Sequence, residues 1–289
     1  MRNTFLKLNS SEKKADFCFI GIKCCSSTEL SGVEDAAGSI RELSYRYANA
    51  DKSALPLKVY NPDEGYILKD VVAYDYGDIS SNLNELEKKI DMIKLENSCI
   101  PIFVGGDHSV TYPILKNISK SHKDIVVLQF DAHSDYIDEY EEYPHGSVMN
   151  AVSKLENVEK IIHFGIRGNL NSGPAIKKSI EDGNLVVPYT EIFSKLKEVL
   201  NIVKDKKIYI SFDVDFLNPT VAPATNCLEP GGPSYEEALK CLKKIIYYAN
   251  DIVGMDFVEY NPKCEGTTVT GIVLVNLIME CMQYIKSKH

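Results

Sequence analysis

DIVVLQFDAHSD, residues 124–135, changes abruptly from apolar to polar after Phe130. Its first half is an almost continuous apolar run rich in β-branched residues, as expected of a parallel strand that is covered on both faces. Its second half brings together Asp131, His133 and Asp135, and the segment that follows, to residue 146, adds further carboxylates and another histidine. A buried strand that ends in such groups predicts a binding or catalytic site at its carboxyl end.

Similar apolar runs recur along the chain. They are DFCFIGI from Asp16, SCIPIFVGG from Ser98, KIIHFGIR from Lys160, KKIYISFDVD from Lys206 and DIVGMDFVEY from Asp251. Between them, Leu83, Leu86, Ile90 and Ile93 recur at helical spacing, and Ser234 with Glu237 forms a capping box. This alternation predicts an α/β fold, a three-layer αβα sandwich with a central parallel sheet. Without repeats or a linker, residues 1–289 are expected to form a single domain.

Composition restricts the function. The net charge of −9 and a pI near 5.3 argue against a nucleic-acid partner and favour cationic small molecules. Eight cysteines without a CxxC pair indicate reduced thiols and a cytoplasmic location. The apolar segment 268–285 is interrupted by polar residues, so we expect a buried helix or an oligomer contact and no membrane span.

Unusual residues gather where the apolar runs stop. FVGGDHS, FDAHSD, SFDVDFLNP and MDFVEYNP each place Asp, His or Glu at a predicted carboxyl end, where parallel sheets bind ligands. Asp213 and Asp215 have the i, i+2 spacing of Asp131, His133 and Asp135, so an extended backbone would turn each set to one face. The Gly105-Gly106 pair before His108 allows the backbone to approach closely at a crowded site.

Several carboxylates placed together need cations. Four aspartates would repel one another strongly in a cleft, and two divalent metal ions would balance their charge. Oxygen and imidazole donors without a thiolate suit Mn²⁺, and paired metal ions typically promote hydrolysis. The predicted ligands are His108, Asp131, His133, Asp135, Asp213 and Asp215.

These motifs, together with HGS at 145–147, resemble the signatures of the ureohydrolases, the arginase/agmatinase family. The resemblance implies an arginase-like sandwich that assembles as a homo-oligomer, a trimer or hexamer, and two Mn²⁺ ions on the six ligands, with Asp131 and Asp213 as bridges. It also implies that His145 is the catalytic histidine and that Glu259 holds the guanidinium group. PHGSVM and GIRG at 165–168 are more similar to agmatinases than to arginases.

The implied reaction converts agmatine to putrescine and urea, as in polyamine biosynthesis. Arginine, guanidinobutyrate and formiminoglutamate are alternative substrates, and a non-catalytic metal-binding relative is a further alternative. Retention of His145 and Glu259 favours an enzyme, because a structural metal site needs neither. The acidic loop 136–144 holds Asp138, Glu139, Glu141 and Glu142, and its negative field predicts a preference for a dicationic substrate.

Some positions depart from the family pattern. Leu30 and Glu34 stand where family members usually carry arginines. Asn218, Ala224 and Asn226-Cys227 stand where Asp and a Gly-Thr-like stretch are common. None of these changes removes a predicted ligand, so they bear on substrate choice and on subunit contacts. His163, within an apolar run, is expected to be a hydrogen-bonded core histidine.

Overall fold

The computed structural model describes residues 4–8, 15–26, 30–48, 59–63, 65–68, 70–93, 99–138, 145–264 and 266–288. In this part of the chain, eight strands form one sheet in the order β4-β1-β5-β10-β9-β6-β7-β8, and every neighbouring pair is parallel. The strands are β1 (Phe17–Lys23), β4 (Ala73–Ser80), β5 (Ile100–Val104), β6 (Ile125–Phe130), β7 (Val158–Ile166), β8 (Leu185–Pro188), β9 (Lys207–Asp213) and β10 (Asp251–Val258). A separate antiparallel hairpin joins β2 (Val59–Asn61) to β3 (Gly65–Ile67).

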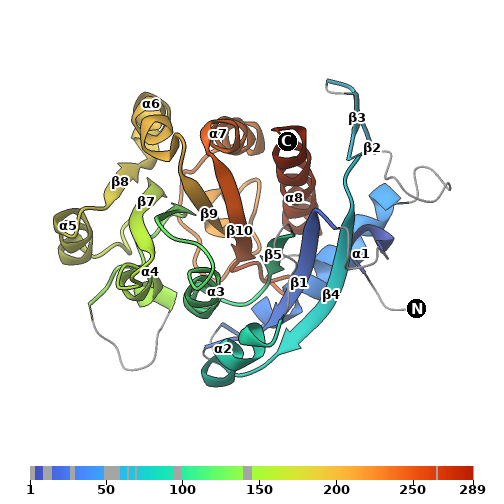
Figure 1. Cartoon of the computed structure of the whole chain (residues 1–289), viewed down its shortest axis with the longest axis horizontal. Helices are drawn as coiled ribbons and strands as arrows, with labels where there is room; N and C mark the ends of the chain where they lie inside the picture. The colour runs from blue at the N-terminus through green and yellow to red at the C-terminus, as the bar shows by residue number, and fades with distance from the viewer. Residues whose placement is uncertain are drawn as a thin grey trace.

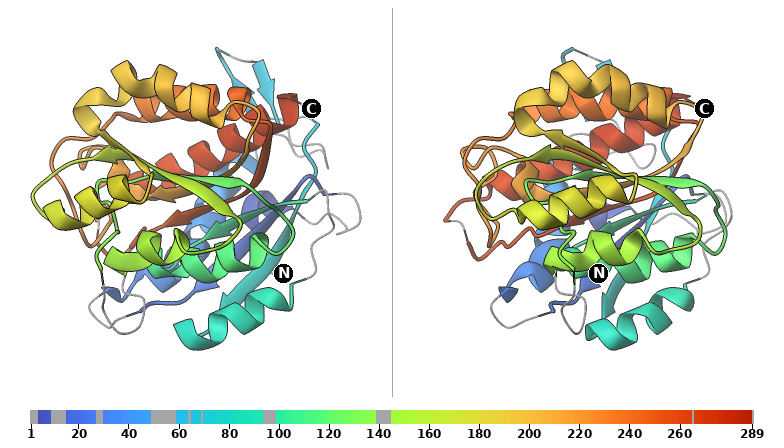
Figure 2. Two further views of the ribbon diagram at one scale, coloured as in Figure 1. Left: turned by 60° about the vertical axis from the view of Figure 1, so that its left-hand side comes forward. Right: turned by 90° about the vertical axis from the view of Figure 1, so that its left-hand side faces the viewer.

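Helices cover both faces of the sheet (Figures 1 and 2). One face packs against α1 (Ala36–Ala48), α6 (Ile192–Val203), α7 (Tyr235–Tyr248) and α8 (Val269–Lys288). The other packs against α2 (Leu83–Asp91), α3 (Thr111–Ile118), α4 (Val148–Val152) and α5 (Gly173–Glu181). Along β6, Val126, Leu128 and Phe130 enter the first core, whereas Ile125 and Val127 enter the second. The predicted three-layer αβα sandwich is therefore confirmed.

The strands that the sequence predicted are the buried ones. β4 and β8 were missed, and they form the two edges of the sheet. β4 alternates between buried and exposed positions, and two of its polar residues, Asp75 and Asp78, pair with Arg41 of α1. An edge strand lacks the continuous apolar run by which the central strands were found. The capping box of α7 is present in both directions, as predicted.

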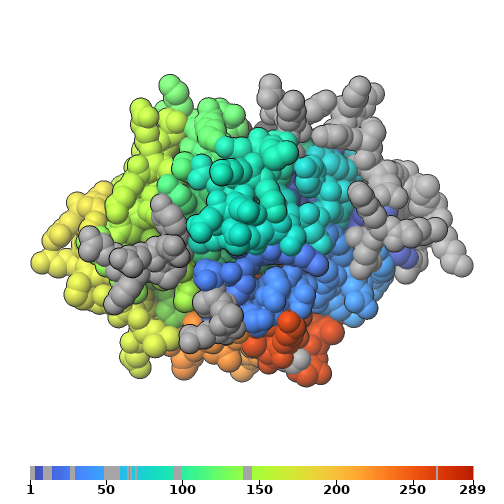
Figure 3. Space-filling model, turned by 90° about the horizontal axis from the view of Figure 1, so that it is seen from below, coloured from blue at the N-terminus to red at the C-terminus, as the bar shows by residue number. Residues whose placement is uncertain are grey.

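Helix α8 contains the predicted buried apolar segment. By length and composition it could cross a membrane, but 61% of its most apolar window is buried inside the structure. It packs against α1 and α7. Figure 3 shows the blue α1 segment beside red C-terminal segments on one face of the molecule. Packing in the core accounts for the apolar character of α8, and its role as an oligomer contact stays a prediction.

Four adjacent central strands, β5, β10, β9 and β6, carry the polar motifs. All four run in the same direction, so their carboxyl ends meet at one edge. His108 follows β5 in a short 3₁₀ helix, η5 (His108–Val110), and Asp215 lies in another, η8 (Val214–Phe216). His145 begins a third, η6 (His145–Ser147). The described residues also form the 3₁₀ helices η1 (Phe5–Lys7), η4 (Val33–Asp35) and η7 (Tyr189–Glu191).

Candidate metal centre and active site

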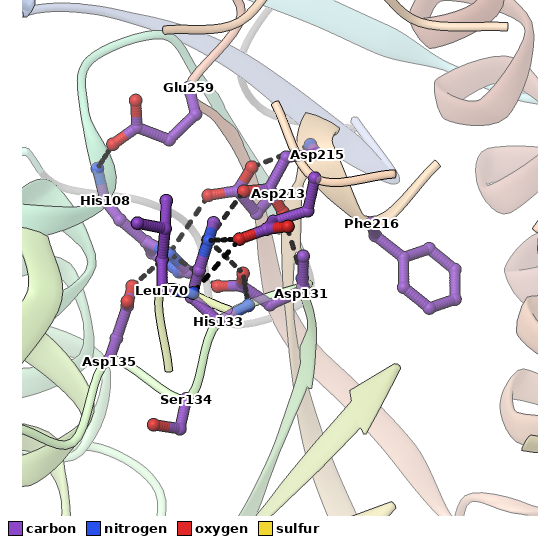
Figure 4. A network of polar contacts seen from close by, with 12 residues as sticks. His108, Asp131, His133, Ser134, Asp135, Leu170, Asp213, Asp215, Phe216 and Glu259 are labelled. Atoms are coloured by element: carbon purple, nitrogen blue, oxygen red, sulfur yellow. Dashed lines mark hydrogen bonds and ion pairs between the residues drawn. The ribbon is translucent and has the colours of Figure 1, made fainter. Parts of the chain in front are cut away.

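His108 lies at the centre of a first cluster (Figure 4). Its Nδ1 is 3.1 Å from Oδ2 of Asp131, 2.9 Å from Oδ2 of Asp135 and 3.3 Å from Oδ2 of Asp213. The imidazole is almost fully buried, and Nδ1 has no hydrogen-bond partner among the described residues. A ring nitrogen that faces three carboxylate oxygens is arranged as the ligand set of a cation.

His133 belongs to a second cluster. Its Nδ1 is 2.8 Å from Oδ2 of Asp215 and 3.7 Å from Oδ1 of Asp131. Asp131 thus turns one oxygen to each histidine, and it is the residue that the two three-residue clusters share. Asp213 lies in the first cluster, and its Oδ1 accepts a hydrogen bond from the Asp215 amide at 2.8 Å. The geometry supports Asp131 as a bridge, while bridging by Asp213 stays a prediction.

The backbone brings these ligands together by turns, which corrects the expectation of extended segments. β6 ends at Phe130 and β9 ends at Asp213. At the end of β9 and directly after β6, an aspartate side chain accepts a hydrogen bond from the amide two residues further on: Asp131 from His133 at 2.6 Å, and Asp213 from Asp215. These are Asx turns, and Asp135 has a left-handed backbone with φ 47°. The side chains converge as predicted, but for a different geometrical reason.

The glycine pair and Glu259 hold the loop after β5. A Cβ on Gly105, whose φ is +101°, would lie 2.7 Å from the Ile22 carbonyl oxygen, so the close approach needs glycine there. The Glu259 amide donates to the Gly106 carbonyl at 3.0 Å, and Glu259 Oε1 accepts from the His108 amide at 2.8 Å. Glu259 itself has φ 62°, a conformation that non-glycine residues rarely adopt. The surroundings therefore fix both His108 and Glu259.

Burial and mutual repulsion raise the pKa values of most of these acids. Burial, reinforced by the charges of Asp215 and Asp135, raises the pKa of Asp131 to about 7. Burial also raises the pKa of Asp213 and of Glu259 well above their ordinary values, with Asp215 and Asp107 respectively adding repulsion. Burial would raise the pKa of Asp215, but the hydrogen bond and charge of His133, together with the Ala132 amide, outweigh burial and lower that pKa.

The pKa values of both histidines are raised as well, although burial opposes a charge on each ring. Burial alone would lower the pKa of His133, but the hydrogen bond to Asp215 and the charges of the surrounding aspartates together outweigh burial and raise that pKa to about 10. Burial opposes a charge on His108 too, and three carboxylates together raise its pKa well above the ordinary range. Metal-free, the clusters favour positive charge on both rings. Oxygen and nitrogen donors in a site that favours positive charge fit two divalent ions of the Mn²⁺ class.

The clusters open into a pocket that His145 and Glu259 also line. Ile137, Leu170 and Cys227 form its apolar side. Oε2 of Glu259 is buried and has no hydrogen-bond partner among the described residues. Of the eight site residues predicted from sequence, five form the two three-residue clusters, and His145 and Glu259 line the pocket beside them. Asp135 lies next to the first cluster, with Oδ2 2.9 Å from His108 Nδ1.

Residues at the departures from the family pattern are bound to one another. Asn226 donates to the Leu30 carbonyl at 3.3 Å, and Asn261 donates to both the Ser31 carbonyl and Asn226 Oδ1. Glu34 accepts from the Gly32 amide and lies 3.9 Å from Lys263. Hydrogen bonds and an ion pair therefore link the described part of the divergent first loop to the segments after β9 and β10. His163 is a buried core histidine bonded to Gln129 and Ser179, as predicted.

Sequence reasoning missed three supporting side chains. His108 Nε2 bonds to Ser211 Oγ at 2.9 Å, and Ser211 donates to Asp256 at 2.7 Å; both residues lie inside the quoted motifs. Arg167, within GIRG, donates to five backbone carbonyls between Asp215 and Pro230. Its position as the last residue of a predicted apolar strand was the available signal.

The fold and the clusters define a metal-dependent hydrolase, and comparison with known proteins specifies the family. The model of the arginase family matches residues 15–283. An agmatinase of Halalkalibacterium halodurans is 29% identical over 239 residues, covering 80% of this chain and 82% of the relative. The human mitochondrial guanidino acid hydrolase is 28% identical over 294 residues, covering 96% and 80%.

Solved structures agree on the fold. The proclavaminate amidino hydrolase of Streptomyces clavuligerus superposes with a TM-score of 0.82 at 21% identity, over 99% of this chain and 97% of that one. A Mn²⁺-containing formiminoglutamase of Trypanosoma cruzi also gives 0.82, at 18% identity, over 99% and 98%. The chain belongs to the arginase family and is a metal-dependent ureohydrolase.

Proposed function

We propose that this chain uses two Mn²⁺ ions to hydrolyse agmatine to putrescine and urea. The observation that carries the proposal is Oε2 of buried Glu259, which has no hydrogen-bond partner in the described part of the chain and lies in the same pocket as both His/Asp clusters. A buried carboxylate oxygen without a donor is a ready partner for a guanidinium N–H group. The reaction needs that group fixed beside the metal ions.

Glu259, the metal ions and His145 each have a defined task in the proposed reaction. Glu259 keeps Oε1 on the His108 amide and offers Oε2 to the guanidinium group, which orients the planar carbon toward the clusters. Two bound ions supply Lewis acidity and an activated water at neutral pH. His145 lines the pocket, which supports a role in passing a proton to the leaving amine.

The walls of the pocket favour agmatine over guanidino acids. Among the described lining residues there is no lysine or arginine to pair with a substrate carboxylate. Ile137, Leu170 and Cys227 offer an apolar path for a methylene chain, and burial raises the pKa of the Cys227 thiol to about 12, which keeps it neutral. Of the acidic loop, Asp138 is described and accepts from Asn150, whereas Glu139, Glu141 and Glu142 lie outside the described residues.

A guanidino acid is the second candidate substrate. The human relative, which covers 96% of this chain, is named a guanidino acid hydrolase. Agmatine carries two positive charges at neutral pH, whereas arginine and guanidinobutyrate each carry a carboxylate. The charge at the end of the substrate away from the guanidinium group therefore distinguishes agmatine from the guanidino acids.

Urea release from agmatine, arginine and guanidinobutyrate, measured with Mn²⁺ at two ionic strengths, tests the proposal. We expect the highest kcat/KM on agmatine. Neutralising Glu139, Glu141 and Glu142 to Gln should narrow the preference for agmatine about 2- to 10-fold, because a charge pair that water screens contributes about 0–1 kcal/mol. The narrowing should be larger at low salt, where such charges are less screened.

Neutralising three exposed acids on helices α5, α6 and α7 that do not line the pocket, Glu181, Glu198 and Glu236, is the matched control and should leave the preference unchanged. Equal or better activity on arginine or guanidinobutyrate would overturn the agmatine assignment. An unchanged preference in the neutralised loop would remove its role in selection.

We further propose a cytoplasmic location and a homo-oligomer, a trimer or hexamer. All eight cysteines are free thiols, which supports a reducing compartment. The family resemblance supports the oligomer, and light scattering of the purified chain measures it directly.

A further inference from the structure

His133 turns one ring nitrogen to its cluster and the other away from it. Nδ1 faces Asp215 and Asp131, so Nδ1 is the atom placed to bind a metal ion. A neutral imidazole that binds through Nδ1 carries its proton on Nε2. That nitrogen is buried and has no hydrogen-bond partner among the described residues. The ligand form of His133 therefore leaves a buried N–H group that needs an acceptor.

The Glu229 carboxylate lies beside this N–H group and can accept from it. Its Oε1 is 3.7 Å from His133 Nε2, slightly beyond a hydrogen bond, and it also accepts from the Leu170 amide at 3.3 Å. Glu229 is 5% exposed, and it does not line the pocket, although Cys227 of the same segment does. A carboxylate so placed faces the back of the histidine and not the substrate.

Gly168 leaves the space that Glu229 occupies. A Cβ on Gly168 would lie 2.0 Å from the Glu229 carboxyl carbon. Arg167 holds the same segment by donating to the Glu229 and Pro230 carbonyls at 3.2 and 3.1 Å. Arg167 and Gly168, which directly follow β7, thus fix the position of the Glu229 carboxylate.

We infer that Glu229 is a positioning residue for the metal site at His133. When Nδ1 binds a metal ion, Nε2–H donates to Glu229, which fixes the tautomer and the ring orientation and makes Nδ1 a stronger donor. His108 uses a different support, the Ser211 hydroxyl backed by Asp256. The two sites therefore have separate supports, and loss of Glu229 should weaken one site and spare the other. This inference rests on the proposed binuclear function.

Glu229→Gln tests the inference, because glutamine keeps the shape but loses the charge. Loss of such an outer partner typically costs about 10- to 100-fold in metal affinity. We expect Mn²⁺ titration to give two ions per chain in the parent protein and a second ion bound about 10- to 100-fold more weakly in the variant. The electron paramagnetic resonance spectrum should change, at limiting Mn²⁺, from a spin-coupled pair to a single ion. Glu229→Asp should restore part of the affinity.

Glu280→Gln is the matched control, because Glu280 is a buried carboxylate on α8, outside the clusters. It should keep both metal affinities. Two ions bound by Glu229→Gln with unchanged affinity, or equal weakening of both sites, would overturn the positioning role while leaving the proposed function intact. A parent protein that binds fewer than two ions would contradict the proposed function, and this inference would fall with it.

Discussion

Asp131 turns Oδ2 toward His108 and Oδ1 toward His133, so a single side chain connects the two clusters. Around it, burial and like charge raise the pKa values of acids that the fold nevertheless holds within contact distance. Such an arrangement costs stability in a metal-free chain and is relieved when cations bind. The positions of these residues therefore favour cation binding and lower the stability of the metal-free fold.

Glu259→Gln should abolish most turnover while both metal ions stay bound. Glutamine can still accept from the His108 amide, but it offers no charge to the guanidinium group, and truncating a buried charge pair costs about 2–5 kcal/mol. Steady-state kinetics and metal analysis on the same sample measure both effects. A kcat/KM equal to that of the parent protein would show that Glu259 has no substrate contact.

His145→Ala separates proton transfer from metal binding. His145 lines the pocket but belongs to neither cluster, so both ions should remain. General acid–base groups contribute about 10²- to 10⁴-fold, and we expect kcat to fall within that range. Unchanged kcat would exclude the proton-transfer role, and loss of metal would place His145 among the ligands.

Metal binding should release protons and should strengthen as pH rises. The pKa of His133 is raised to about 10 in the metal-free site, so at pH 7.5 the ring carries a proton that binding through Nδ1 must displace. Raising the pH from 7.5 toward 10 removes this competition. Calorimetry of Mn²⁺ binding in two buffers of different ionisation enthalpy counts the protons. Binding without proton release would contradict the raised pKa.

Most of these residues could be predicted from the sequence because they lie directly after apolar runs. Such positions mark the carboxyl ends of parallel strands, where ligands bind. Glu229 could not, since it lies in an irregular segment with no local pattern. The left-handed backbones of Asp135 and Glu259 were equally out of reach, because tertiary contacts and not local propensity hold them.

Among the elements, central strands and capped helices were predictable, and edges were not. β6 and β9 are buried on both faces and carry continuous apolar runs. The edge strands β4 and β8 are partly exposed. β8 ends at Pro188, and proline is tolerated there because no further strand needs the N–H group that it lacks. The strand ends also misled prediction, because Asx turns replaced the expected extended backbone.

Ser234→Ala should destabilise the fold through one helix end. Ser234 accepts from the Glu237 amide, and the Glu237 side chain accepts from the Ser234 amide, so the substitution breaks a complete capping box. We expect the free energy of unfolding to fall by about 0.5–2 kcal/mol. Ser194→Ala, at an exposed helix position, is the control and should stay within about 0.5 kcal/mol. Equal unfolding midpoints in urea for the two variants would contradict a stabilising cap.

At the scale of the whole molecule, topology assembles the site. β9 and β10 come last among the strands in sequence yet insert between β5 and β6, so motifs more than a hundred residues apart become neighbours. The covering helices seal both faces of the sheet, and the carboxyl edge is left for ligands (Figures 1 and 2). No short segment of the chain holds a complete cluster by itself.

Metal analysis of the parent protein and of Asp131→Asn after Mn²⁺ reconstitution tests this account most directly. Asp131 serves both clusters, so removing its charge should reduce loading from two ions per chain to below one and remove turnover. Asp213→Asn should also lower loading, with a larger effect on the site at His108. Two tightly bound ions in Asp131→Asn, together with parental urea release, would contradict the shared metal centre.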